Sequence, residues 1–300
     1  MPLEPTPQAC SGPLFESNAD LEKFKRELRT SAVGREIIFQ PRTHSTNDLA
    51  LAGARNGAAH GTLFITDEQQ RGRGRWGRSW EAPPRLGLLF SVLIRPAALP
   101  PAKFGWLPLL AGWAAAEGLR QACALPARLK WPNDIVLSCD APPGWKKLGG
   151  VLGESVLAAG REEPDSRAYF VLGIGLNINQ QKAELPATAK APPTSARLEK
   201  GVPFLRAHVL RAVLEQLDQT IGGLARSEDG LAAGQREIET QLRQWWPPER
   251  KLQLQMAGKN GAAAHREGYF TGLDAAGRLR LKTKDGGELV TADAEIISVA

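Results

Sequence analysis

Residues Gln69–Trp80 read QQRGRGRWGRSW, a segment in which four arginines alternate with three glycines. Glycine lets a backbone approach a ligand closely, and arginine offers a rigid fork of donors that suits phosphate and carboxylate groups. Because so many like charges repel one another, we expect this loop to be mobile until an anion neutralises it. A cationic loop that closes over an anion is typical of a chamber for an activated acyl or phosphoryl group.

The same loop allows other interpretations. Gly72–Gly77 fits the dinucleotide fingerprint GxGxxG, which requires a helix directly after it and an acidic residue about 20 positions later. Ser79–Pro84 cannot open a helix, and no Asp or Glu lies between Glu81 and Glu117, so we reject that reading. A solvated basic loop, or one that binds nucleic acid, stays open at this point.

Composition and charge suit a protein that handles anions inside a cell. The chain has 300 residues, of which 42% are apolar, and a formal net charge of +6. These values fit one large domain plus a small one and an anionic ligand, a nucleic acid or an acidic partner. The three cysteines show no CxxC spacing, which argues against a disulfide framework or a zinc site. Without a secretory signal or an apolar run of about 20 residues, we expect a cytoplasmic protein that does not enter a membrane.

Hydrophobic patterning divides the chain into three parts. Residues 1–34 are expected to form an extension with one short helix after a frayed, Pro-rich start. Residues 35–246 combine clustered strands with amphipathic helices, which predicts an α+β domain with a mixed sheet. Residues 247–300 read as a small barrel of short strands separated by glycine turns. The expected barrel strands are Lys251–Met256, Gly268–Leu273, Gly277–Lys282, Glu288–Thr291 and Glu295–Val299.

Further clusters place polar residues at strand ends or helix starts. Ser45–Asn47 fits a helix N-cap, and a helix N-terminus can also bind an anion or a polar head group. Lys130–Asp134 reads KWPND, a turn in which Asp134 could hold Mg²⁺ on a nucleotide phosphate. Lys147–Glu154 (KLGGVLGE) and Gly173–Asn179 (GIGLNIN) carry glycines inside strands, which indicates that a ligand or another backbone lies close by. Ordinary turns and bulged core strands explain the same letters, so both interpretations stay open.

Several common catalytic patterns are missing. The sequence contains no GxxxxGK[ST], HExxH, GxSxG or EF-hand loop, and its four histidines are scattered. A P-loop enzyme, a metal hydrolase and a serine hydrolase triad are therefore disfavoured.

Taken in order, the blocks STN, GRGRxGRxW, KWPND, KLxGVLxE and GxGxNxN resemble those of the biotin–protein ligases, the biotin–[acetyl-CoA-carboxylase] ligases. The resemblance is strong over about residues 35–180 and rests on pattern alone in the C-terminal part. It implies a class II aminoacyl-tRNA synthetase-like α+β catalytic domain with a mixed β-sheet, followed by a small SH3-like barrel. It further implies an ATP-dependent enzyme that activates biotin as biotinyl-5′-AMP, uses Mg²⁺, and transfers biotin to a lysine of the biotin carboxyl carrier protein of acetyl-CoA carboxylase.

The resemblance also implies roles for single residues. The implied biotin-binding residues are Ser45, Thr46, Asn47, Gln69, Arg73, Gly74, Arg75 and Lys147. The implied nucleotide-binding residues are Arg73, Arg78, Trp131, Asn133 and Asn177, and the implied metal-binding residues are Asp134 and Asn177. The implied catalytic residues are Lys147, Arg75, Asp134 and Lys130, with Asp134 as an aid to deprotonation of the acceptor lysine.

One departure from the family pattern bears on DNA binding. Many members carry an N-terminal winged helix-turn-helix of about 60 residues, whereas 44 residues precede Ser45 here. We therefore expect a monofunctional enzyme without a DNA-binding domain, as a monomer or weak homodimer. Two alternatives are a lipoate–protein ligase, whose usual RRxSGGG-type block is absent, and a basic nucleic-acid-binding repressor, which the confinement of basic residues to one loop disfavours.

Overall fold

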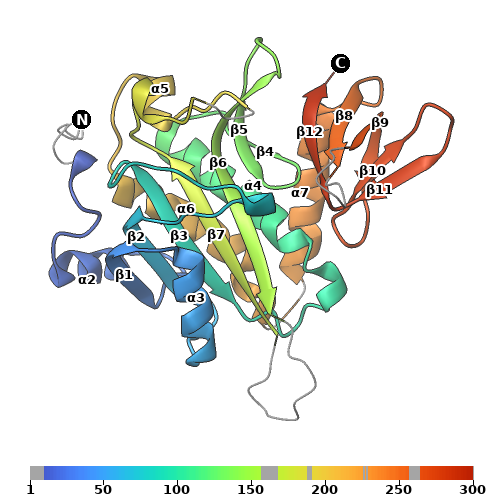
Figure 1. Ribbon diagram of the computed structural model, residues 1–300. Helices are drawn as coiled ribbons and strands as arrows, with labels where there is room; N and C mark the ends of the chain where they lie inside the picture. Colours follow the sequence, from blue (N-terminus) through green and yellow to red (C-terminus); the bar gives the residue numbers. More distant parts are fainter. Residues whose placement is uncertain are drawn as a thin grey trace.

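Two β-sheets organise the protein (Figure 1). The computed structural model describes residues 10–156, 168–187, 191–225, 227, 229–256 and 264–299. Within these ranges the larger sheet has seven strands in the order β1-β2-β3-β7-β6-β5-β4. Strands β1 and β2 run parallel and the other neighbours antiparallel, so the predicted α+β fold with a mixed sheet is confirmed. The strands are Ile37–Thr43 (β1), Leu63–Gln69 (β2), Gly87–Ile94 (β3), Arg128–Lys130 (β4), Asp134–Ser138 (β5), Trp145–Val156 (β6) and Tyr169–Asn177 (β7).

Helices cover both faces of this sheet. Helix α3 (Thr46–Arg55) packs on the face that carries Phe64 and Leu93. Helices α4 (Trp106–Cys123) and α6 (Arg206–Ile221) pack against each other and cover the opposite face. Strand β3 is consequently buried at every residue, which explains why its sequence GLLFSVLI shows no alternation. Among the described residues, no helix combines the length and the apolar character needed to cross a bilayer. The other α-helices are α2 (Asn18–Glu27), α5 (Ala196–Lys200) and α7 (Asp229–Trp245).

The C-terminal sheet is antiparallel throughout, in the order β11-β10-β9-β8-β12. All five predicted strands are present, although β9 begins four residues earlier and β10 two residues later than the glycine turns suggested. The observed strands are Lys251–Met256 (β8), Ala264–Leu273 (β9), Leu279–Lys282 (β10), Glu288–Thr291 (β11) and Ala294–Val299 (β12).

Aromatic residues fix this small barrel to the larger domain. The rings of Trp245 and Trp246 stack at 5.3 Å between centroids, and Trp246 meets Phe270 of the barrel edge-on at 5.7 Å. The indole N–H groups of Trp106 and Trp131 donate to the carbonyls of Ala275 and Gly277 in the β9–β10 turn, at 3.1 and 3.2 Å. The barrel is thus attached to the larger domain by apolar stacking and by two buried indoles.

The N-terminal segment differs from the expectation of a frayed start. Residues 1–9 lie outside the described part, but Leu14 and Phe15 are buried, and Phe15 contacts Phe24 and Phe39 edge-on. The Leu14 amide donates to the carboxylate of Asp67, which is itself buried. The prediction was wrong for residues 10–17, because burial of the Leu14 and Phe15 side chains offsets the entropic cost of ordering this segment.

The Asp218 carboxylate anchors the turn after helix α2. Asp218 on α6 accepts backbone hydrogen bonds from Ser31, Ala32 and Val33 at 2.7, 2.9 and 2.8 Å. Burial alone would raise the pKa of Asp218, but these backbone donors outweigh it and hold that pKa below its ordinary value. The resulting stabilisation is present above the ordinary carboxyl pKa and is lost as the pH falls through the lowered value.

We predict that Asp218→Asn lowers the free energy of unfolding at pH 7 by about 1–2 kcal/mol, the scale of a half-exposed charged hydrogen-bond acceptor. The difference from wild type should shrink as the pH falls through the lowered pKa of Asp218, where the native carboxylate becomes protonated. Urea unfolding at pH 7 and at acidic pH measures both values, with the exposed Asp140→Asn as control. A difference that is independent of pH would contradict this role.

Candidate functional site

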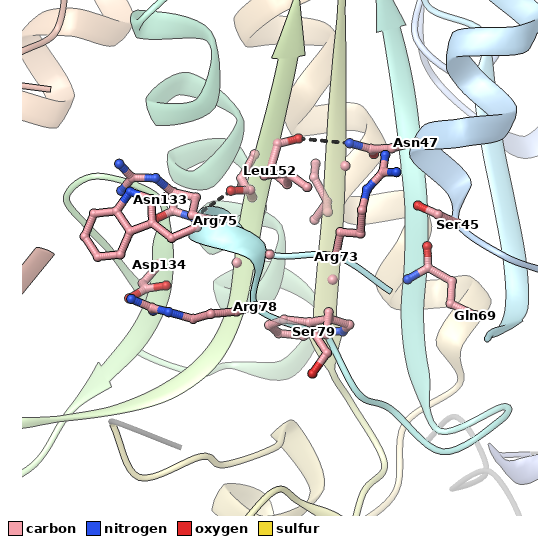
Figure 2. A pocket seen from close by; sticks show the side chains of 18 of the residues that line it. Ser45, Asn47, Gln69, Arg73, Arg75, Arg78, Ser79, Asn133, Asp134 and Leu152 are labelled. Atoms are coloured by element: carbon pink, nitrogen blue, oxygen red, sulfur yellow. Dashed lines mark hydrogen bonds between the residues drawn. The ribbon is translucent and has the colours of Figure 1, made fainter. Parts of the chain in front are cut away.

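Residues from the separate sequence clusters line one cavity (Figure 2). It lies between the start of α3, the arginine–glycine loop, strands β6 and β7, and Glu295 of the barrel. The predicted site residues that line it are Ser45, Thr46, Asn47, Gln69, Arg73, Gly74, Arg75, Arg78, Asn133, Asp134 and Lys147. Three predicted residues, Lys130, Trp131 and Asn177, are not part of this lining.

A side chain distant in sequence caps helix α3. Ser45 occupies the N-cap position but forms no side-chain capping bond, and its hydroxyl faces the cavity (Figure 2). The first helical amide, that of Thr46, donates instead to Gln69 Oε1 at 2.8 Å. The end of β2 and the start of α3 are therefore tied together at the cavity wall.

Asn47 belongs to a buried polar chain. Its Oδ1 lies 2.6 Å from Ser91 Oγ, and its Nδ2 donates to Glu154 Oε2 at 2.5 Å. A Cβ atom at residue 173 would lie 2.1 Å from Asn47 Oδ1, so this strand position has no room for a side chain. Glu154 in turn pairs with Arg73 at 3.0 Å. Glu154 closes the KLGGVLGE block, yet the sequence interpretation assigned it no role.

The glycines of β7 make room for side chains of the protein itself. A Cβ at residue 175 would come within 2.6 Å of the Trp80 ring. A Cβ at residue 173 would likewise come too close to Asn47. The sequence pattern predicted a ligand or another backbone beside these glycines. The nearest neighbours are instead two side chains that form the cavity wall, because both residues cross β7 where a Cβ would obstruct them.

A carboxylate between two lysines forms the next part of the site. The Lys147 ammonium lies 2.5 Å from Asp134 Oδ1, and the Lys130 ammonium 3.5 Å from Asp134 Oδ2. Lys130 is 1% exposed and its ammonium lies 4.9 Å from the ring centroid of Trp145, so it supports Asp134 from behind the cavity. Burial lowers the pKa of Lys130 below its ordinary value.

The charge state of Asp134 follows from these neighbours. Burial alone would raise its pKa, but Lys147 and then Lys130 outweigh that effect and hold the pKa below its ordinary value. The carboxylate is therefore ionised at neutral pH. In this geometry Asp134 orients the Lys147 ammonium. Its expected role as an aid to deprotonation of the acceptor lysine stays a prediction.

A second cavity adjoins the first. The two share Arg78, Ser79, Trp80, Asp134, Lys147 and Glu295. Asn177 lines this second cavity, with its Nδ2 donating to the Thr194 carbonyl at 3.0 Å. Trp131 lies in a third cavity, beside the barrel turn that its indole contacts. The nucleotide-binding residues predicted from the sequence are thus divided among neighbouring cavities.

The arginine-rich loop is closed by carboxylates of the protein. Arg73 pairs with Asp48 and Glu154, and Arg78 pairs with Glu295 of the barrel at 2.7 Å. The sequence predicted a loop that stays mobile until a ligand anion arrives. In the structure, carboxylates of the protein pair with Arg73 and Arg78, and the mobility of the loop stays a prediction. The contribution of the barrel was missed because no local pattern links residues 73–78 to residues more than 200 positions away.

The donor set does not fit a resident metal ion. Within the described residues no three His, Cys, Asp or Glu side chains gather as metal ligands. Both oxygens of Asp134 already face ammonium groups, and Asn177 Oδ1 accepts from Gln180 Nε2 at 3.2 Å. Magnesium bound through one or two carboxylates takes most of its other ligands from phosphate and water, so here it would arrive with a nucleotide.

Comparisons with known proteins agree with this geometry. Residues 39–172 match the biotin/lipoate A/B protein ligase family. The chain is 31% identical over 274 residues to the bifunctional ligase/repressor BirA of Bacillus spizizenii, which covers 90% of this chain and 76% of that protein. It is 30% identical over 263 residues to the biotin–[acetyl-CoA-carboxylase] ligase of Paracoccus denitrificans, covering 84% of this chain and 96% of that protein.

A solved structure extends the similarity to the fold. The biotin protein ligase from Aquifex aeolicus in complex with biotin and ATP superposes with a TM-score of 0.67 at 26% identity, covering 87% of this chain and 98% of that chain. Similarity over most of the length, in sequence and in fold, shows that this chain belongs to the biotin–protein ligases of the biotin/lipoate A/B protein ligase family.

Proposed function

We propose that this enzyme activates biotin as biotinyl-5′-AMP and then transfers it to a lysine of a carrier protein. The observation that carries the proposal is the position of Lys147 in the wall shared by two adjoining cavities. A ligand made of biotin and a nucleotide needs two compartments with a cation where they meet. At that point the biotin carboxylate and the α-phosphate, both anions, are brought together.

The residues around the first cavity suit the biotin end. The Ser45 hydroxyl, Asn47 and Gln69 supply polar groups at the start of α3, and Trp80 supplies an aromatic wall over β7. The second cavity, lined by Asn177, suits the nucleotide, with Asn133 and Arg78 next to the junction. Lys130 and Trp131 act through neighbours, Lys130 by supporting Asp134 and Trp131 by fixing the barrel turn.

The chemistry follows from these positions. A biotin carboxylate oxygen attacks the α-phosphorus, the bond from that phosphorus to the bridging oxygen breaks, and pyrophosphate leaves. Lys147 and the loop arginines reduce the repulsion between the two anions and stabilise the charge of the transition state. The neutral amine of the acceptor lysine then attacks the acyl carbon, AMP leaves, and one proton is released as the amide forms. The closed loop keeps water from the reactive anhydride.

The remaining assignments are also proposals. Magnesium enters with ATP as the Mg·ATP substrate. The acceptor is the biotin carboxyl carrier protein of acetyl-CoA carboxylase, because relatives carry the name of that reaction. The cytoplasm suits a reaction that consumes ATP and a chain whose Cys10, Cys123 and Cys139 are free thiols.

Intact-mass measurement of a carrier domain tests the function directly. Incubation with the enzyme, biotin and Mg·ATP should add one biotinyl group to one lysine of the carrier. Lipoate in place of biotin, and omission of ATP, should give no addition. Efficient addition of lipoate with none of biotin would instead identify a lipoate–protein ligase.

Lys147→Ala should slow formation of biotinyl-AMP by about 10²-fold or more, the scale of losing one preorganised electrostatic contact. Pyrophosphate release in the absence of carrier measures this step. Lys146→Ala is the matched control, because Lys146 is the adjacent lysine but pairs with Glu199 at 3.0 Å, outside the two cavities. Equal rates for Lys147→Ala and Lys146→Ala would refute the assignment.

Gly173→Ala should raise the KM for biotin about tenfold or more while leaving the KM for ATP close to its wild-type value. The added methyl group would lie 2.1 Å from Asn47 Oδ1 and push that side chain out of position. Even a small displacement of a group that positions the substrate weakens its contribution strongly. Gly223→Ala serves as control, since a Cβ there meets nothing within 4 Å. A larger effect on ATP than on biotin would place biotin elsewhere.

A further inference from the structure

The C-terminal barrel contacts the arginine-rich loop through one turn and the start of β12, residues 292–295. Arg78 donates from both terminal nitrogens to Glu295, at 3.1 and 2.7 Å. Arg75 donates to the backbone carbonyls of Ala292 and Ala294, at 3.3 and 3.4 Å. The Trp76 indole N–H donates to Asp293 Oδ1 at 2.7 Å. We call Asp293 and Glu295 the barrel carboxylates.

The loop adopts a demanding conformation at this contact. Trp76 has a φ of 57° and a ψ of 37°, the left-handed region that a bulky residue rarely occupies. Two guanidinium groups lie near its ring, with the Cζ atoms of Arg75 and Arg78 at 5.1 and 5.0 Å from the ring centroid. Such a conformation persists only where the surroundings hold it, and here the barrel supplies several of the contacts that do so.

The same contact faces the reaction chamber. Glu295 lines both adjoining cavities, together with Arg78, and its side chain is only 14% exposed. Charge-assisted, two-pronged bonds of this kind are stronger and more specific than neutral ones. The ion pair between Arg78 and Glu295 therefore helps to hold the loop over the chamber.

From these contacts we infer that the barrel carboxylates are positioning residues that hold the loop Arg73–Arg78 closed, so that the barrel retains the biotinyl-AMP intermediate. The inference rests on the function proposed above. Attachment of the barrel does not depend on these carboxylates, because Trp106, Trp131 and the stack of Trp246 on Phe270 join the barrel to the larger domain independently. Removing one carboxylate should free the loop without releasing the barrel.

Hydrogen exchange of the ligand-free enzyme tests the first half of the inference. In Glu295→Gln and in Asp293→Asn, amides of residues 72–79 should exchange faster than in wild type, while amides of β8 and β9 keep their protection. Glu288→Gln is the control, because the Glu288 side chain, on strand β11, pairs with Arg280 of the barrel and not with the loop. Asp293 has 65% of its side chain exposed, so its substitution leaves folding intact. Unchanged exchange in both variants, or equal acceleration in Glu288→Gln, would overturn the inference.

Release of the intermediate tests the second half. Enzyme loaded with biotin and Mg·ATP should lose biotinyl-AMP about tenfold faster in Glu295→Gln, on the scale of losing a charged hydrogen bond, and should label lysines of a bystander protein. The KM for biotin should rise more than the rate of pyrophosphate release falls, a split that general destabilisation would not produce. Wild-type release rates with a mobile loop would overturn the retention role. Absence of biotinyl-AMP in the wild-type enzyme would refute the proposed function, whereas the exchange experiment would still decide whether the barrel holds the loop.

Discussion

The arginines and lysines of the site must be paired with carboxylates of the protein when no anionic ligand is bound. The arrangement of the site depends on this requirement. The arginines of the loop meet Asp48 of helix α3, Glu154 of strand β6, and Asp293 and Glu295 of the barrel. These carboxylates come from three separate parts of the fold, so pairing with them also fixes where the loop lies.

The pair formed by Lys147 and Asp134 applies the same principle at shorter range. A buried carboxylate would be costly by itself, but two lysines keep it ionised, and it holds one of their ammonium groups at the junction of the cavities. In the reaction proposed above, the biotin carboxylate and the acceptor lysine are the nucleophiles, so the enzyme needs none of its own. Its contribution is the placement of charge and the exclusion of water, which suits a reaction in which ATP supplies the activation.

The sequence predicted what depends on local signals. Strands bounded by glycine turns were recognisable in the barrel, and the resemblance of the motif blocks to the biotin–protein ligases implied most of the predicted residues that line the cavity. Contacts between residues far apart in the sequence could not be predicted. Neither the capping of Thr46 by Gln69 nor the pairing of Arg78 with Glu295 has a signature in the intervening residues.

Two expectations depended on neighbours that the sequence could not identify. Glycines in β7 indicated that a ligand or another backbone lies close by, whereas the side chains of Asn47 and Trp80 are the nearest neighbours. The loop was expected to be mobile because only its own charges could be counted in the sequence, and the carboxylates that neutralise it come from other elements. In both cases the pattern located an important position correctly but could not identify the neighbour.

A crystal structure of the full chain with a non-hydrolysable analogue of biotinyl-AMP tests the central claim most directly. We predict that the phosphate of the analogue lies beside Lys147 Nζ, that the biotin rings contact Ser45–Asn47 and Trp80, and that the loop covers both. A nucleotide bound away from Lys147, with the loop displaced into solvent, would contradict this account.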